Sequence, residues 1–220
     1  MALFSMEGLA FVFRWLHYFA GVIWIGLLYY FNFVHGAFMA EAEASAKPTV
    51  VQKLLPKALW WFRYGALYTF VTGALILGLK GHTAGMEIYS TSWGVAILTG
   101  ATFGTLMFLN VWGIIWRNQK KVIAGAPDAQ AAAGKALLAS RTNTMFSIPM
   151  LFFMGAASHL PISIESGNFG LLTLVLAILI GALELNAIFG KLGRIATIKG
   201  VITAGFILTA VVYAIIEVIL

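Results

Sequence analysis

The chain has 220 residues, of which 61% are apolar and only 10% are charged. Soluble globular proteins carry about 25% charged residues, so this composition excludes an ordinary water-soluble domain and indicates a chain embedded in lipid. The absence of cysteine excludes disulfides, thiolate zinc sites, iron–sulfur clusters and covalent C-x-x-C-H haem attachment, so a redox centre needs histidine ligands or a diffusible cofactor.

Six stretches free of Asp, Glu, Lys and Arg can each hold a membrane helix of about 20 residues once flanking aromatic residues are included. The predicted fold is an all-α integral membrane protein, a bundle of six transmembrane helices forming one domain over residues 1–220. The first helix is predicted to be retained, because its apolar run exceeds the roughly 7–15 residues of a signal peptide. The predicted spans lie near residues 9–38, 58–79, 93–116, 143–158, 169–190 and 200–219.

The basic residues indicate how these helices are oriented. Eleven of the fourteen Lys and Arg residues lie in the connections 39–57, 117–141 and 190–199. Cytoplasmic loops are the ones that carry such an excess, so both termini are predicted outside, and 117–141 is predicted as a solvated cytoplasmic hairpin. The net charge of +6 then reflects the orientation of the helices in the membrane, so a nucleic-acid partner is not expected. The predicted location is the bacterial inner membrane, which the chain crosses several times.

Two histidines are predicted at similar depth near the outer face. His17 lies about two turns into the first helix and His159 ends the fourth. Two helices with one histidine each can hold a b-type haem between their imidazoles. Gly21 is expected to let the macrocycle approach the first helix, and Arg14 to pair with a propionate. Histidine-bound copper at this place stays an alternative, as does a histidine bonded to a neighbouring carbonyl.

The other two histidines are assigned lesser roles. His82 lies in an outer loop and is kept as a reserve haem ligand. His35 follows His17 by five helical turns, on the same face but about 27 Å away along the axis. Since no other histidine lies on the cytoplasmic side, a second bis-histidine haem is not expected.

His35 instead belongs to a predicted polar cluster at the cytoplasmic ends of the helices. Arg63 is expected to bind an anion or a planar acceptor, with Glu184 as its counter-ion or as a proton carrier. The alternative is that Arg63 and the neighbouring tryptophans form an interfacial aromatic belt. The candidate pocket for a small anionic substrate or a quinone comprises Asn32, His35, Arg63, Asn110, Asn143, Thr144, Ser147, Glu184 and Asn186.

Four runs of the sequence together resemble one known family. They are RWLHYFAGVIWIG at 14–26, LWWFRYG at 59–65, NVWGIIW at 110–116, and SRTNT at 140–144 followed by His159. They resemble the membrane domain of the bacterial cytochrome-c-linked urate oxidases, over nearly the whole chain.

The resemblance implies a multi-helix membrane domain linked to oxidation of urate to 5-hydroxyisourate, with electrons leaving through a C-terminal cytochrome c. This chain stops at Leu220 with no C-x-x-C-H, so an external cytochrome c or respiratory complex is expected to take the electrons. The positions that match the family's motifs are His17, His159, Arg63, Asn110, Arg141 and Asn143.

These observations lead to one main functional prediction and two alternatives. The main one is a membrane redox protein, possessing one b-type haem, that passes electrons from a small substrate or a quinone to an external acceptor. The first alternative is a non-enzymatic anchor subunit of a larger complex, whose polar residues serve helix packing. The second is a carrier for a small anion, in which Arg63 binds charge and Glu184 handles protons.

Overall fold

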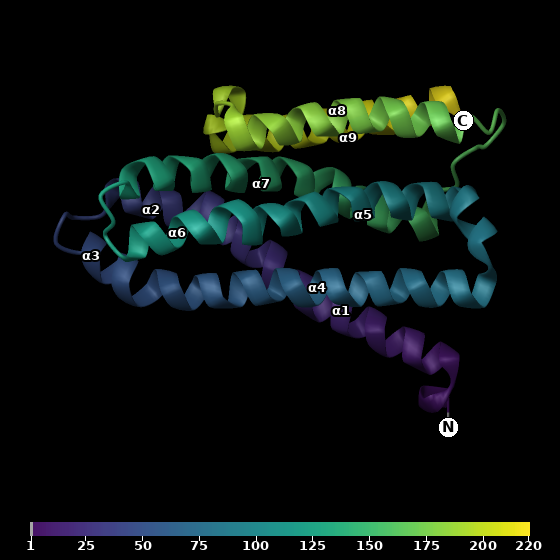
Figure 1. Ribbon diagram of the computed structural model, residues 1–220, viewed down its shortest axis with the longest axis horizontal. Helices are drawn as coiled ribbons and strands as arrows, with labels where there is room; N and C mark the ends of the chain where they lie inside the picture. Colours follow the sequence, from purple (N-terminus) through teal and green to yellow (C-terminus); the bar gives the residue numbers. More distant parts are fainter. Residues whose placement is uncertain (1) are drawn as a thin grey trace. The chain divides into compact units, whose positions relative to one another are not determined.

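The computed structural model describes residues 2–220, and these residues form helices with no strand (Figure 1). Two compact units can be distinguished. The first comprises the residues up to Leu79 and Phe108–Ser140, and the second comprises Lys80–Met107 and Arg141–Leu220. The all-helical class predicted from the sequence is confirmed for the described residues.

The helix bounds differ from the predicted spans mainly by extension into the flanking charged segments. The helices are α1 (Met6–Tyr29), α2 (Gly36–Glu41), α3 (Lys47–Thr49), α4 (Leu55–Ala84), α5 (Ser92–Asn110), α6 (Trp116–Ile123), α7 (Ala129–His159), α8 (Phe169–Phe189) and α9 (Ile198–Ile219). Three π-helical turns join consecutive helices into longer rods, at Tyr30–His35, Val50–Leu54 and Val111–Ile115.

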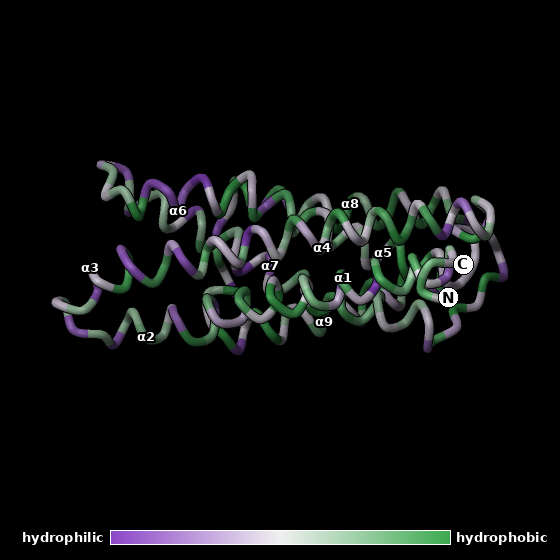
Figure 2. The backbone as a smooth tube through the Cα atoms, turned by 90° about the horizontal axis from the view of Figure 1, so that it is seen from below, coloured by the Kyte–Doolittle hydropathy of each residue, from purple (hydrophilic) through white to green (hydrophobic). Residues whose placement is uncertain are grey.

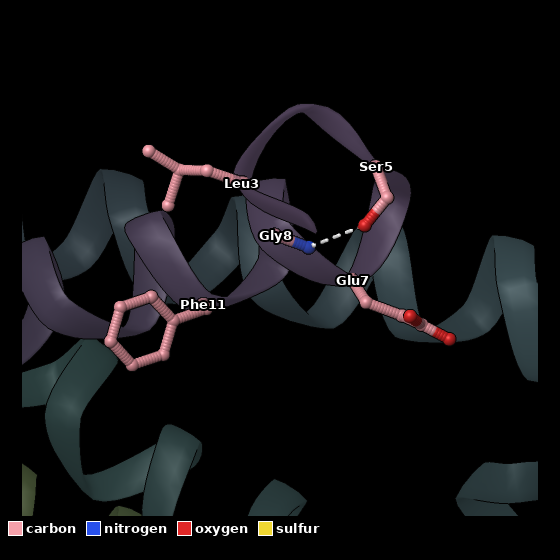
Figure 3. Close-up of a pocket in the computed structure, with 5 residues that line it drawn as sticks. All are labelled: Leu3, Ser5, Glu7, Gly8 and Phe11. Atoms are coloured by element: carbon pink, nitrogen blue, oxygen red, sulfur yellow. Dashed lines mark hydrogen bonds between the residues drawn. The ribbon is translucent and has the colours of Figure 1, made fainter. Parts of the chain in front are cut away.

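The start of α1 is set by local hydrogen bonding. Ser5 has extended backbone angles, and its Oγ accepts a hydrogen bond of 3.1 Å from the backbone N–H of Gly8, while Glu7 lies in the first turn. Both features favour a helix N-terminus. Together with Leu3 and Phe11, these residues line a shallow hollow of about 280 Å³ (Figure 3). None of the predicted site residues lines this hollow.

Among the described residues, five helical rods are long and apolar enough to cross a membrane. They are Met6–Glu41, Lys47–Ala84, Ser92–Ile123, Phe169–Phe189 and Ile198–Ile219. Figure 2 shows that the hydrophilic residues of the first unit concentrate around α2, α3 and α6. Several helices of this chain are therefore long and apolar enough to cross a membrane, which is the pattern of a membrane protein.

Helix α7 contains the predicted span 143–158 but is not one of these five. Its 31 residues are enough to cross a bilayer at 1.5 Å per residue, yet a run of polar residues lowers its hydropathy. Those residues are buried: Thr142, Asn143, Thr144 and Ser147 are each no more than 1% exposed. A sixth span and the outward termini stay predictions.

The segment 117–141, predicted as a solvated and partly helical hairpin, consists of two helix ends joined by a turn. Helix α6 continues to Ile123 and α7 begins at Ala129, so only a short turn separates them. The ammonium of Lys121 lies 2.6 Å from the Asp128 carboxylate, and this hydrogen bond lowers the pKa of Asp128. The alanines at one face of the first turns of α7 are buried, namely Ala132, Ala136 and Ala139.

Close helix contacts in each unit depend on glycine. In the first unit, Figure 1 shows α1 crossing α4, and a Cβ atom added to Gly65 would lie 3.1 Å from the backbone nitrogen of Trp24. In the second, a Cβ atom on Gly100 would lie 3.2 Å from the nitrogen of Met154. Gly104, four residues later, also faces α7, at the side chain of Met150, and small residues at this spacing allow helices to pack closely. Helices α8 and α9 lie side by side in the same unit (Figure 1).

Candidate functional site

His17 is held at the contact of α1 with α4. Its Nδ1 lies 2.9 Å from the backbone carbonyl oxygen of Thr69 and 3.2 Å from the Oγ1 of Thr72. A carbonyl oxygen can only accept, so Nδ1 carries the proton, and Nε2 is left with its lone pair. Nε2 forms no hydrogen bond with any described residue. A half-buried imidazole in this tautomer is prepared to bind a metal through Nε2.

The glycine that makes room for this imidazole is Gly73 on α4. A Cβ atom at Gly73 would approach the Cε1 of His17 to 3.0 Å, which is closer than ordinary van der Waals contact. Gly21, the glycine singled out from the sequence, lies instead against the methyl group of Thr69, where a Cβ atom would make an ordinary contact at 3.9 Å. Arg14 is exposed on α1.

His159 has a similar hydrogen bond in the second unit. Its Nδ1 lies 3.0 Å from the carbonyl oxygen of Gly155, one turn earlier on α7, and its side chain is exposed. The proton therefore lies on Nδ1 here as well, and Nε2 is the free ring nitrogen. His82, the reserve ligand, is exposed at the end of α4 and belongs to the same unit as His159.

The predicted polar cluster is divided between the two units. His35, Arg63 and Asn110 belong to the first unit, and Asn143 and Glu184 to the second. In the first unit, Asn32 is 3% exposed, and its Nδ2 donates to the Leu28 carbonyl at 2.9 Å and to the Ser140 hydroxyl at 2.8 Å.

The π-helical turn Tyr30–His35 places His35 among aromatic rings. The imidazole lies 5.8 Å from the ring centroids of both Tyr30 and Phe31. Its buried Nδ1 makes no hydrogen bond with a described residue, and neither does the buried Oδ1 of Asn32. π-helical turns occur often at functional sites, and this turn, between α1 and α2, places two buried polar atoms without a hydrogen-bond partner close together in the chain.

Arg63 stacks on aromatic rings. The Cζ of its guanidinium lies 3.8 Å from the ring centroid of Trp116 and 5.1 Å from that of Tyr64. Trp112 fixes the backbone at this point, since its Nε1 donates to the Arg63 carbonyl at 3.2 Å. A stacked guanidinium keeps its positive charge and in-plane donors available to an anion.

In the second unit, the buried polar residues of α7 bind backbone groups. Asn143 Nδ2 donates to the Met107 carbonyl of α5 at 2.9 Å, and the Ser147 hydroxyl to the Thr144 carbonyl at 2.8 Å. Burial lowers the pKa of Arg141, whose Nε and Nη1 make no hydrogen bond with a described residue. Glu184 is half-buried on α8.

Replacing Asn143 with leucine is expected to destabilise the fold by roughly 1–3 kcal/mol, because the Met107 carbonyl loses a buried donor. Thermal unfolding in detergent measures this. Asn118→Leu is the matched control, since the Asn118 side chain bonds to a carbonyl of its own helix at Ile114. Equal losses of stability in the two variants would contradict a special role for the interhelical bond.

The described residues contain no group of three or more His, Asp or Glu side chains that could hold a metal ion. A metal centre built from a protein cage of that kind is therefore not present in this part of the chain. In His17 and in His159, Nε2 is left as the ring nitrogen that can accept a partner.

A family model described as urate oxidase N-terminal matches residues 82–217. This is more than half of the chain. The chain belongs to the urate oxidase N-terminal family. The match includes the 110–116 and 140–159 motifs, and therefore His159, while His17 and Arg63 precede it. No curated protein and no solved structure matches the chain.

Several residues of the site were not identified from the sequence. Thr69, Thr72 and Gly73 surround His17, and Trp112 and Trp116 hold Arg63. Threonine and glycine are ordinary constituents of membrane helices, so nothing in their spacing marks them as partners of a histidine on another helix.

Proposed function

We propose that this member of the urate oxidase N-terminal family is a membrane redox protein that holds one b-type haem between His17 and His159. In this proposal six helices cross the bacterial inner membrane with both termini outside. The haem then lies near the outer face. The observation that carries the proposal is that each histidine donates its Nδ1 proton to a backbone carbonyl.

That hydrogen bond matters because histidines that bind metals nearly always donate their other ring N–H to a carbonyl or carboxylate. It fixes the ring orientation and increases the basicity of Nε2. The Thr69 carbonyl would do this for His17, and the Gly155 carbonyl for His159. With His17 and His159 as its ligands, a b-type haem would supply one-electron transfer at this place.

The remaining residues take part in binding. Arg14 would pair with a haem propionate. The aromatic-stacked guanidinium of Arg63 would bind an anionic substrate, with His35, Asn110, Asn143 and Glu184 completing the polar cluster. Urate is the substrate that the family suggests, and a quinone is the other proposed electron donor. An external cytochrome c, or a respiratory complex, would accept the electrons.

The test is a dithionite-reduced minus oxidised absorption spectrum of the detergent-purified protein, with a pyridine haemochrome assay. We expect sharp b-type bands that are lost in His17→Ala and in His159→Ala, since loss of an axial ligand changes both affinity and spin state. His35→Ala is the control and is expected to keep the bands.

Each other outcome has a definite meaning. If His82→Ala removes the bands while His159→Ala keeps them, His82 is the second ligand. If protein produced with ample haem shows no bands, the redox proposal fails. Uptake of a small anion by vesicles would then favour the carrier, and its absence the anchor subunit.

A further inference from the structure

A shallow, mainly apolar hollow of about 380 Å³ lies on the surface of α4. Its lining residues are Pro56, Lys57, Trp60 and Trp61. The last three have the i, i+3 and i+4 spacing that brings side chains to one helix face. The two indoles are 45% and 55% exposed, so the hollow opens to the surroundings of the helix.

The walls of the hollow are held by ring contacts. The centroids of Trp60 and Trp61 lie 5.0 Å apart with the ring planes at 82°, and Trp60 also lies 4.7 Å from the ring centroid of Tyr64. The first pair is edge-to-face and the second is tilted, and both contacts stabilise the positions of the rings. The two tryptophans therefore form one preformed apolar wall. Aromatic residues of an interfacial belt that do not contact one another would not form such a wall.

The charge beside this wall is positive and unopposed. Lys57 is exposed and forms no ion pair or hydrogen bond with any described residue. Lys53 lies one turn earlier, and the sequence contains no acidic residue between Glu43 and Glu87. The stem of a lysine packs along apolar surface while its ammonium stays in water, so one cation stands at the rim of an apolar hollow.

We propose that this hollow binds one anionic phospholipid, with the phosphate at Lys57 and the glycerol and upper acyl chain against Trp60 and Trp61. The arrangement complements an amphiphile. The apolar wall would contact the acyl chain, which a free inorganic anion lacks, and the ammonium of Lys57 attracts an anionic headgroup more strongly than a zwitterionic one. The position on a membrane-length helix, at the end predicted to be cytoplasmic, gives lateral access from the leaflet that is rich in anionic lipid. The proposal is independent of the haem.

The test is native mass spectrometry of the full chain, delipidated in detergent and titrated with short-chain phosphatidylglycerol or phosphatidylcholine. We expect Lys57→Gln to weaken phosphatidylglycerol binding about fivefold, the usual effect of one basic residue near an anionic surface, and to weaken phosphatidylcholine binding less, because the choline cation of that lipid offsets its phosphate charge. The double variant Trp60→Ala, Trp61→Ala is expected to weaken both lipids equally. Circular dichroism of each variant verifies that the helices are intact, and Trp61→Phe, which keeps a ring, is expected to retain binding.

Lys80→Gln is the matched control, because Lys80 lies at the other end of the same helix, with its ammonium 5.7 Å from the Trp93 ring centroid. It is expected to bind both lipids as the wild type does. If Lys57→Gln and Lys80→Gln weaken phosphatidylglycerol binding equally, the lipid is held only by general electrostatic attraction and the proposal is overturned. Displacement of phosphatidylglycerol by an equal concentration of inorganic phosphate would overturn it as well, by making the hollow a simple anion site.

Discussion

Gly205→Leu is expected to leave little correctly folded protein. A Cβ atom at this position would collide with the Cδ1 of Ile148 and lie 3.0 Å from the backbone carbonyl oxygen of Met145, both on α7. The Ile148 side chain can rotate, whereas the Met145 carbonyl moves only if the two helices separate. Inserting extra carbon atoms into a packed contact lowers the free energy of unfolding by roughly 1–3 kcal/mol. Because the leucine at 205 would press against backbone, we expect its effect at or above the upper end of this range.

Yield after size-exclusion chromatography and the midpoint of thermal unfolding measure this effect. The matched control is Gly181→Leu on α8, where an added Cβ atom has no neighbour within 4 Å. That variant is expected to keep the wild-type midpoint or to raise it slightly, since leucine is a better helix former than glycine. Comparable damage from both substitutions would mean that the contact of α9 with α7 is not the cause.

Gly73→Leu is expected to abolish haem binding while leaving the protein folded. A Cβ atom at Gly73 would approach the His17 ring to 3.0 Å, and the end of a side chain yields more easily than a backbone does. The imidazole would rotate away and lose its bond to the Thr69 carbonyl. Because loss of the bond that orients a ligand typically lowers metal affinity about 10–100-fold, the haemochrome assay should show a nearly haem-free protein with a normal elution volume.

Gly78→Leu, on the same helix, is the comparison, because an added Cβ atom there meets nothing within 4 Å. Its haem content is expected to equal that of the wild type. Full haem content in Gly73→Leu would show that the position of the His17 ring is irrelevant to the cofactor. If Gly73→Leu also failed to fold, Thr72→Val would test the same orientation by removing only the hydroxyl that lies 3.2 Å from Nδ1.

The locations of the helices were predictable, because the lipid environment requires long apolar stretches whatever their packing. The predicted ends were too short where the chain stays helical past the apolar stretch, as in the second span, which was predicted at 58–79 and forms α4 from Leu55 to Ala84. The predicted span 143–158 lies in a helix that is not among the five apolar rods, because polar residues interrupt it. Its polar residues, such as Asn143, are compatible with lipid only because they are buried within the folded chain.

The sequence by itself determined the class of the protein, the places of its apolar helices and the two histidines worth testing, since these depend on composition and on spacing along one helix. Only the tertiary structure decided which groups those residues contact. The Nδ1 of His17 reaches the Thr69 carbonyl of another helix, and that contact depends on the close approach of α1 to α4 at Gly65. Helical periodicity places side chains on a face of one helix. Which faces then meet is set by the fit of two surfaces, and the fit depends on residues distant in the chain.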